Sequence, residues 1–202
     1  MGKIKNLWLW VNIIRSIPAI LSMYLSKEKH TIKKDVERWI DIKTPKQNNY
    51  SAWFNLHWLI LNSPEFRNLF YYRIKKYNLL IAKFLEIFYR PLNTLYIHTP
   101  DIGEGLYIQH GFSTIISAQK IGKNCSINQQ VTIGYASTGN PIISDNVLIT
   151  SGAKVFGKVN IGKNSKIGAN CVVVKDIPQN CTVVGIPAHI VKKDGERVNI
   201  SL

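Results

Sequence analysis

The feature that most constrains the fold is a six-residue repeat of aliphatic side chains in the second half of the chain. An α-helix repeats every 3.6 residues and so has no period of six, and an ordinary protein of β-hairpins would not hold this spacing for so long. Short repeats sustained over many units are typical of a parallel β-helix, in which three hexads form one triangular coil of about eighteen residues. The repeat occupies Ile121, Ile127, Ile133, Ile143, Ile149, Val155, Ile161, Ile167 and Val173.

The residues between these aliphatic positions predict short strands joined by sharp corners. Gly and Asn tolerate left-handed backbone angles, which we expect the corners to require. The side chain four positions after an aliphatic residue is small or branched, as a narrow interior demands, so Cys125 and Cys171 are predicted to be core thiols. The corner candidates are Gly103, Gly122, Gly134, Gly162, Gly168, Asn124, Asn146, Asn164 and Asn170.

The repeat changes its spacing at two places. Ile102 and Ile108 already have the six-residue spacing, but one extra residue near Thr114 shifts the repeat before it continues at Ile121. Between Ile133 and Ile143 the spacing is ten residues, so residues 134–141 are predicted to project as a loop. Loops that project from a rigid scaffold commonly carry binding groups.

The first ninety or so residues predict helices instead. Ile32, Val36 and Ile40 fall on one apolar stripe together with Trp39. The sequence from Ser63 to Glu65 predicts a helix start, with a capping hydroxyl, a proline in the first turn and an acid near the positive end. A further helix is expected to begin near Asn78 and to stop by Pro91.

The predicted fold class is therefore α+β. A helical region over residues 1–95 precedes a β-helix over residues 96–190, and residues 191–202 are expected to form a C-terminal tail. The length suits one compact unit or two small ones.

Positive charge is concentrated in the helical region. The chain has a formal net charge of +14, and residues 1–95 carry 16 Lys and Arg against 6 Asp and Glu, a net charge of +10. Such a basic region suits nucleic acid, a membrane surface or an anionic substrate. Because no zinc-finger, RNP or basic-zipper pattern accompanies the charge, we do not expect a nucleic-acid partner.

Residues 7–25 are the one targeting-like stretch of the sequence. Asn12, Arg15 and Pro18 interrupt it, which disfavours a membrane-spanning helix. No small-residue cleavage pattern follows, which disfavours a signal peptide. The stretch predicts either ordinary packing or a helix that lies at a membrane interface, where basic and aromatic side chains are favoured. These side chains are Lys3, Lys5, Trp8, Trp10 and Arg15.

The three cysteines predict neither disulfides nor a metal site. Their number is odd, no secretory pattern accompanies them, and none has the spacing of a zinc motif. We therefore expect a reduced, cytoplasmic setting with, at most, peripheral contact on the inner face of a membrane.

The β-helix half resembles the left-handed β-helix acyltransferases with hexapeptide repeats. Within that family it is most similar to the serine acetyltransferases and to related O-acetyltransferases of surface-polysaccharide synthesis. The helical region resembles, more weakly, the helices that these enzymes carry in front. The segments that carry the resemblance are residues 108–111, 128–134, 151–154, 167–170 and 184–188.

The resemblance implies an acetyl-CoA-dependent O-acetyltransferase with His110 as the general base. Imidazole has a reference pKa of about 6.5, so near neutral pH it can accept the proton of an attacking hydroxyl and return it to the leaving thiolate. Backbone N–H groups would stabilise the oxyanion. The implied acceptor-binding residues are Gln109, Asn128 and Tyr135, and the implied acetyl-CoA residues are Ser151, Gly152, Ala169, Lys175 and Lys192, with Lys193 as a further candidate.

The sequence departs from the serine enzymes where the acceptor is recognised. Gln109 replaces an acid before the catalytic histidine, Leu95 stands where an acid normally orients the imidazole, and residues 138–141 replace an Asp-Arg-His stretch before a proline. The sequence therefore favours a sugar of a surface polysaccharide or its precursor as acceptor, with serine as the alternative. The group that orients His110 is left open between Asp101, Glu104, a backbone carbonyl and a neighbouring subunit.

Two other classes remain in competition. A γ-type carbonic anhydrase on this fold needs three zinc-binding histidines, and only His98 and His110 lie near suitable places, so no metal is expected. A scaffold without catalysis is the non-enzymatic alternative. The resemblance implies a homotrimer, which the helical region could pair into a hexamer.

Overall fold

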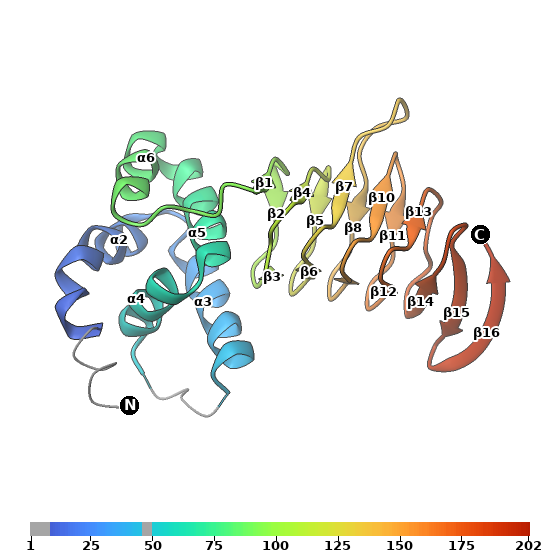
Figure 1. The fold of residues 1–202 in the computed structure, drawn as a ribbon, viewed down its shortest axis with the longest axis horizontal. Helices are drawn as coiled ribbons and strands as arrows, with labels where there is room; N and C mark the ends of the chain where they lie inside the picture. Colours follow the sequence, from blue (N-terminus) through green and yellow to red (C-terminus); the bar gives the residue numbers. More distant parts are fainter. Residues whose placement is uncertain (1–8, 46–49) are drawn as a thin grey trace. The chain divides into compact units, whose positions relative to one another are not determined.

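The chain divides into two compact units, with the boundary after Leu92. The computed structural model describes residues 9–45 and 50–202 (Figure 1). The boundary lies three residues before the one expected from the sequence. Lys3, Lys5 and Trp8, which were expected at a membrane interface, lie outside the described residues.

The first unit is helical. The apolar stripe predicted around Trp39 is buried on α3. In α6 the Asn78 side chain accepts a hydrogen bond from the Ile81 N–H at 3.0 Å, so the predicted start near Asn78 is confirmed, and the helix ends before Pro91. The helices are α2 (Ile13–Leu25), α3 (Lys29–Lys43), α4 (Ala52–Asn62), α5 (Pro64–Tyr77) and α6 (Leu79–Phe88).

The predicted hydroxyl cap at Ser63 is wrong. Pro64 does open α5, but the Ser63 side chain makes no capping hydrogen bond, and its Oγ is buried without a partner. Ser63 is the single residue between α4 and α5, and its N–H closes α4 by donating to the Leu59 carbonyl. A residue that ends one helix and begins the next has little freedom to aim its side chain at the second helix.

The helical core combines aromatic packing with a buried ion pair. Trp39 packs edge-to-face on Phe66, with ring centroids 5.2 Å apart. Arg73 Nε lies 2.9 Å from Asp35 Oδ2, and both side chains are buried. Over residues 9–45 and 50–202, none of the helices has the length and apolar character needed to cross a bilayer.

The second unit is a parallel β-helix of five coils, as the six-residue repeat predicts. Three sheets form the faces of the prism, and successive coils pair in parallel. Sheet A contains β1 (Leu95–Ile97), β4 (Thr114–Ile116), β7 (Thr132–Gly134), β10 (Lys154–Phe156) and β13 (Val172–Val173). Sheet B contains β2 (Asp101–Ile102), β5 (Lys120–Ile121), β8 (Ile142–Ile143) and β11 (Asn160–Ile161).

Sheet C is the longest of the three because a hairpin extends it. Its parallel strands are β3 (Tyr107–Gln109), β6 (Ser126–Asn128), β9 (Leu148–Ile149), β12 (Lys166–Ile167) and β14 (Cys181–Val184). Two antiparallel strands, β15 (His189–Lys193) and β16 (Glu196–Ser201), follow β14. We name the edges of the prism by the sheets that meet there, so the chain crosses the A–B, B–C and C–A edges in each coil.

Residues 191–202 therefore belong to the sheet and are not a tail. Asp194 and Gly195, both with positive φ, form the turn between β15 and β16. An Asp-Gly pair is one of the strongest short-range signals for a hairpin. The Asp194 carboxylate also accepts a hydrogen bond from the Asn180 amide at 2.8 Å and ends a ladder of side-chain amides along the B–C edge, made of Asn146, Asn164 and Asn180.

The predicted interior positions are confirmed, but the role predicted for glycine is wrong. All nine aliphatic positions of the repeat are buried, and the corner asparagines have φ between 55° and 60°. Gly103 and Gly122 are not among the residues with positive φ. A Cβ on Gly122 would lie 2.6 Å from the Asp145 nitrogen of the next coil. These glycines let successive coils approach, whereas asparagine supplies the left-handed corners.

Candidate functional site

The C–A edge brings the predicted base and several predicted acetyl-CoA residues into one column. Strand pairing aligns Ile108 with Ile127, Ile127 with Ile149, and Ile149 with Ile167. The residue two positions after each of these aliphatic residues therefore lies at the edge, and these edge residues stack from coil to coil. Backbone hydrogen bonds link the coils there, from the Gly152 N–H to the Gln129 carbonyl and from the Asn170 N–H to the Ser151 carbonyl. The column consists of His110, Gln129, Ser151 and Ala169.

His110 occupies a tight turn at the head of this column. The Gly111 N–H donates to the Gln109 carbonyl at 2.8 Å across it, and His110 has a φ of 64°. The side chain is exposed, next to the exposed Gln109 and the half-buried Asn128, with which Gln109 is paired between strands. Positive φ in a residue other than glycine is uncommon in general, but it recurs at the corners of this prism, as at Asn124 and Gln130, so the angle belongs to the corner geometry. The turn thus presents an accessible imidazole at the edge of the prism.

Neither carboxylate considered as an orienting group lies at this edge. Asp101 is on β2 and pairs with Lys120 at 3.0 Å. Glu104 lies at the B–C edge and pairs with Lys123 at 3.2 Å. Within the part of the chain that the structure describes, the imidazole of His110 has no hydrogen-bond partner. Asp101 and Glu104 are therefore engaged by lysines of the adjacent coil, away from this edge.

The sequence analysis did not identify two residues at or beside the column as site residues. Gln129 lies between His110 and Ser151 in the column. Its place could have been predicted, because Gln129 follows Ile127 by two positions just as His110 follows Ile108. Asn170 lies against Gly152, where an added Cβ would collide with the Asn170 side-chain oxygen, and Gly152 has a φ of 73°. Glycine is therefore required at Gly152 both by its backbone angle and by its neighbour.

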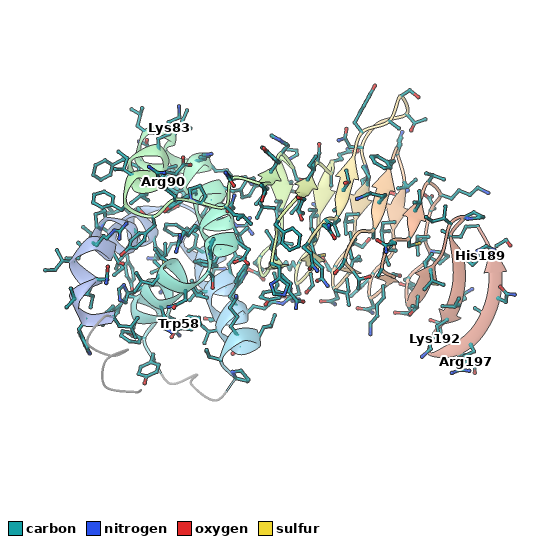
Figure 2. All side chains as sticks on the ribbon, in the orientation of Figure 1. Trp58, Lys83, Arg90, His189, Lys192 and Arg197 are labelled. Atoms are coloured by element: carbon teal, nitrogen blue, oxygen red, sulfur yellow. The ribbon has the colours of Figure 1, made fainter. Side chains whose placement is uncertain are left out.

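The structure places three predicted site residues away from the column. Tyr135 is exposed in the loop between β7 and β8, which projects at the A–B edge as predicted (Figure 1). Lys175 follows β13 at that same edge. Lys192 pairs with Thr182, near the B–C end of sheet C, and Figure 2 shows it at the opposite end of β15 from His189. Within one subunit, these residues do not share an edge with His110.

An apolar pocket of about 470 Å³ adjoins the lower end of the column. Gly185, which follows the column in the fifth coil, leads directly into one wall of the pocket. The outward-facing side chains of β13 and the residue after it form another wall, and Lys175 supplies the one basic group. The lining residues are Val172, Val174, Lys175, Ile186, Pro187, Ala188 and Leu202. The pocket can therefore accommodate the apolar part of an elongated ligand, with one basic group for an anion.

The cysteines lie inside the prism, as predicted for Cys125 and Cys171. Burial raises the pKa of the Cys171 and Cys181 thiols, which keeps them protonated near neutral pH. The Cys125 thiol donates to the Ser144 carbonyl. Among the described residues, no three His, Cys, Asp or Glu side chains cluster in a way that could hold a metal ion. His98 stacks on Tyr96 after β1, at a different edge from His110.

The chain is similar in sequence and in structure to serine acetyltransferases. The chain is 44% identical over 135 residues to a serine acetyltransferase of Staphylococcus xylosus, covering 63% of this chain and 61% of that protein. A solved serine acetyltransferase of Brucella abortus, in complex with coenzyme A, has a TM-score of 0.64 and 28% identity, covering 87% of this chain and 72% of that one. The Neisseria gonorrhoeae serine acetyltransferase in complex with serine has a TM-score of 0.62 and 29% identity, covering 79% and 67%. No protein-family model matches the chain.

These similarities confirm the predicted class. The chain has an α+β fold, with a helical region followed by a left-handed parallel β-helix. It resembles hexapeptide-repeat acyltransferases in sequence and structure, and among them it resembles the serine acetyltransferases in particular. The chain spans 61% of the length of the S. xylosus relative and about half of the length of a Staphylococcus aureus relative.

Proposed function

We propose that this chain is an acetyl-CoA-dependent O-acetyltransferase with His110 as the general base. The observation that carries the proposal is the column at the C–A edge, where an exposed imidazole in a tight turn heads the line that contains Ser151 and Ala169. An acyl transferase needs a proton acceptor next to a groove for its donor. The similarity to serine acetyltransferases supports the same chemistry.

The reaction assigned to His110 is a direct transfer. The acceptor hydroxyl oxygen attacks the thioester carbonyl carbon, and the imidazole takes the hydroxyl proton as the C–O bond forms. The C–S bond then breaks, and the thiolate of coenzyme A receives the proton from the imidazolium. Because no acyl-enzyme is needed, the buried thiols of Cys125, Cys171 and Cys181 take no part.

The donor is proposed to lie along the column, with its acetyl end near His110. Gly152 is assigned to the pantetheine arm by the resemblance alone, because the Asn170 side-chain oxygen fills the space that a Cβ would occupy there. The pocket beyond Gly185 offers apolar walls, and Lys175 offers a charge for a phosphate. The Brucella abortus neighbour, solved with coenzyme A, supports this donor. Lys192 and Lys193 lie toward the B–C end of sheet C, so Lys175 is the better candidate among the lysines.

The comparisons favour L-serine as acceptor over the polysaccharide sugar expected from the sequence. The curated relatives are named serine acetyltransferases, and the Neisseria gonorrhoeae neighbour was solved with serine. A sugar hydroxyl remains the second candidate because of one specific observation. The loop over residues 134–141 contains no charged residue, and Gln109 is neutral, so neither offers a partner to the charges of an amino acid.

A homotrimer is proposed because one subunit leaves sheet A uncovered. Tyr96 and Ile115 are neighbours in the register of this sheet, and both side chains are exposed. Burial of such a face against adjacent copies would place the A–B edge of one subunit near the C–A edge of another. This arrangement would bring Tyr135 of one subunit to the site headed by His110 of another. Ile115→Glu should then reduce the subunit number measured by analytical ultracentrifugation.

The experiment that tests the function is a CoA-release assay with L-serine and with a panel of nucleotide sugars. His110→Ala should lower the rate by about 10²- to 10⁴-fold, which is the usual range for loss of a general base. His30→Ala, in the helical unit, is the matched control and should retain the rate. Full activity of His110→Ala would overturn the assignment, and the acceptor with the highest kcat/KM decides between serine and a sugar.

A further inference from the structure

Helix α2 exposes its apolar side and buries its small, polar side. Ile14 and Leu25 are 74% and 69% exposed, and Ile17 and Leu21 continue the same stripe at helical spacing. The buried side consists of Ser16, Ala19, Ser22 and Met23. A surface helix of a globular protein normally turns its apolar stripe toward the core.

Hydrogen bonds fix this inverted orientation. The hydroxyl of Ser16 lies 2.8 Å from Nδ1 of His57 and 3.0 Å from the Tyr89 hydroxyl, and all three side chains are buried. The Ser22 hydroxyl donates to the Ala19 carbonyl. Rotation of α2 to bury its apolar stripe would break the bonds of Ser16 with His57 and Tyr89 and leave buried polar groups without partners, whereas the Ser22 bond lies within α2 and would turn with the helix. The outward position of the stripe is therefore a property of the folded unit.

Helix α6 also exposes an apolar stripe, and it is in contact with α2. Leu80 and Ile87 are 76% and 75% exposed, with Phe84 between them, so the three form one stripe at helical spacing. The opposite side of the helix buries only Ala82 and Leu85. Two neighbouring helices thus present exposed apolar stripes among the residues described for this unit.

A basic pocket of about 370 Å³ connects the two helices. Arg15 of α2 lies at one side, with its guanidinium 4.2 Å from the ring centroid of Tyr89, and Ile87 of α6 lies at the other. Arg67 is fixed there because it donates to the carbonyls of Ile60, Leu61 and Arg90. The lining residues are Arg15, Leu61, Arg67, Ile87, Phe88, Tyr89 and Arg90.

The charges around the stripes are almost all positive. Helix α2 contains no acidic residue, and the only acid of α6, Glu86, pairs with Lys75 at 3.5 Å. Within the described ranges, Arg15 and Arg90 form no ion pair with an acid. Lys83 adds a further positive charge on α6, and Figure 2 shows it and Arg90 on this part of the helical unit. The pocket therefore offers an arginine cluster to an anion.

We infer that the α2–α6 surface binds the interface of an anionic phospholipid bilayer. The hydrocarbon boundary would take up the two apolar stripes, while the headgroup phosphates would meet Arg15 and Arg90. Charge complementarity selects this occupant, because a second copy of the same surface would bring arginine clusters together. The inference is independent of acetyl transfer and would place the enzyme beside a membrane.

Flotation of the full-length protein with vesicles tests the inference. Phosphatidylcholine vesicles that contain phosphatidylglycerol should bind the protein, and vesicles of phosphatidylcholine alone should bind much less. Leu21→Ser with Ile87→Ser should lower partitioning by at least about tenfold. Arg15→Gln with Arg90→Gln should lower it about fivefold per arginine. Matched controls on the other unit, Ile200→Ser for exposed apolar area and Lys163→Gln for charge, should bind like the parent.

Three results would overturn the inference. The first is no binding, or equal binding to neutral and anionic vesicles. The second is unchanged binding of both double variants, with circular dichroism showing that they are folded. The third is a reduced subunit number for Leu21→Ser with Ile87→Ser in analytical ultracentrifugation, which would assign the surface to a second copy. CoA release should be the same in all of these variants, so failure here is separable from failure of the proposed chemistry.

Discussion

The helical unit and the β-helix bury polar groups in different ways. Among the described residues, the buried polar side chains of the β-helix are the hydroxyls of Thr99, Thr114 and Ser165, and its coils are joined mainly by backbone hydrogen bonds. The helical unit also buries hydroxyls, but in addition it buries an ion pair, Asp35 with Arg73, and the imidazole of His57. In the β-helix the same pattern of backbone hydrogen bonds recurs in every coil. The helical unit depends on individual contacts between side chains that occur only once.

The two units can be followed separately in solution. All five tryptophans of the chain precede residue 59, so tryptophan fluorescence reports only on the helical unit. Far-ultraviolet circular dichroism reports on both units. Denaturation followed by both signals therefore assigns the effect of a substitution to one unit.

The largest effect should come from breaking the buried ion pair. Asp35→Ala leaves the Arg73 guanidinium buried without its carboxylate, and removal of one partner of such a pair usually costs about 3–5 kcal/mol. The urea midpoint measured by tryptophan fluorescence should fall strongly, while the transition of the β-helix should keep its midpoint.

An exposed ion pair on the same helix is the matched control. Lys34 and Glu37 lie 2.8 Å apart with both side chains exposed, so Glu37→Ala should cost no more than about 0.5 kcal/mol. The double substitution Asp35→Leu with Arg73→Met should recover part of the loss, because it removes both charges. Equal costs for Asp35→Ala and Glu37→Ala would show that the helical unit does not depend on this contact.

A smaller effect is expected from crowding the coils of the β-helix. A Cβ on Gly122 would lie 2.6 Å from the Asp145 nitrogen and 2.7 Å from the Ser144 carbonyl carbon. Gly122→Ala should therefore cost about 1–3 kcal/mol in the β-helix transition measured by circular dichroism. The fluorescence transition should not move.

Asn124→Gly, at the same corner, separates close approach from backbone angle. Asn124 has a φ of 55°, which glycine adopts freely, so this substitution should change stability by only a few tenths of a kcal/mol. If Asn124→Gly proved the more damaging of the two, the corner angle and not the coil spacing would be the limiting feature.

The β-helix could be predicted from the sequence because its contacts recur at fixed spacing. Ile127 and Ile149 are aligned neighbours, and the repeat that predicts their burial also defines the three edges. The ion pair of Asp35 and Arg73 joins residues 38 positions apart with no period, so no local pattern could have indicated it. The inverted orientation of α2 could not be predicted for a similar reason, because it depends on contacts of Ser16 with His57 of α4 and with Tyr89 after α6, which are far away in the sequence.

The candidate site was only partly accessible to the same reasoning. The resemblance indicated His110. The eighteen-residue coil predicted that Ser151 lies next to Ala169, and the strand register, which aligns Ile149 with Ile167, agrees. The repeat also contained the information that Tyr135 lies one hexad beyond Gln129 and hence at another edge. What it could not supply is the group that orients His110, because Asp101 and Glu104 are engaged by lysines of the adjacent coil.

The smallest predicted effect concerns pH and again distinguishes the two units. His57 is buried, its Nε2 donates to the Leu9 carbonyl at 3.0 Å, and burial lowers its pKa below the usual value of 6.5, although the Leu9 hydrogen bond opposes this shift. Below about pH 6.5 the unfolded chain therefore binds more protons at this residue than the folded one. The helical unit should lose stability as the pH falls from about 6.5 toward the folded pKa, with no further loss from this group below it. His57→Gln should reduce the difference between the urea midpoints at about pH 7.5 and 5.5, measured by tryptophan fluorescence, whereas His30→Gln should retain it. An unchanged difference in His57→Gln would mean that other groups determine the acid sensitivity of the helical unit.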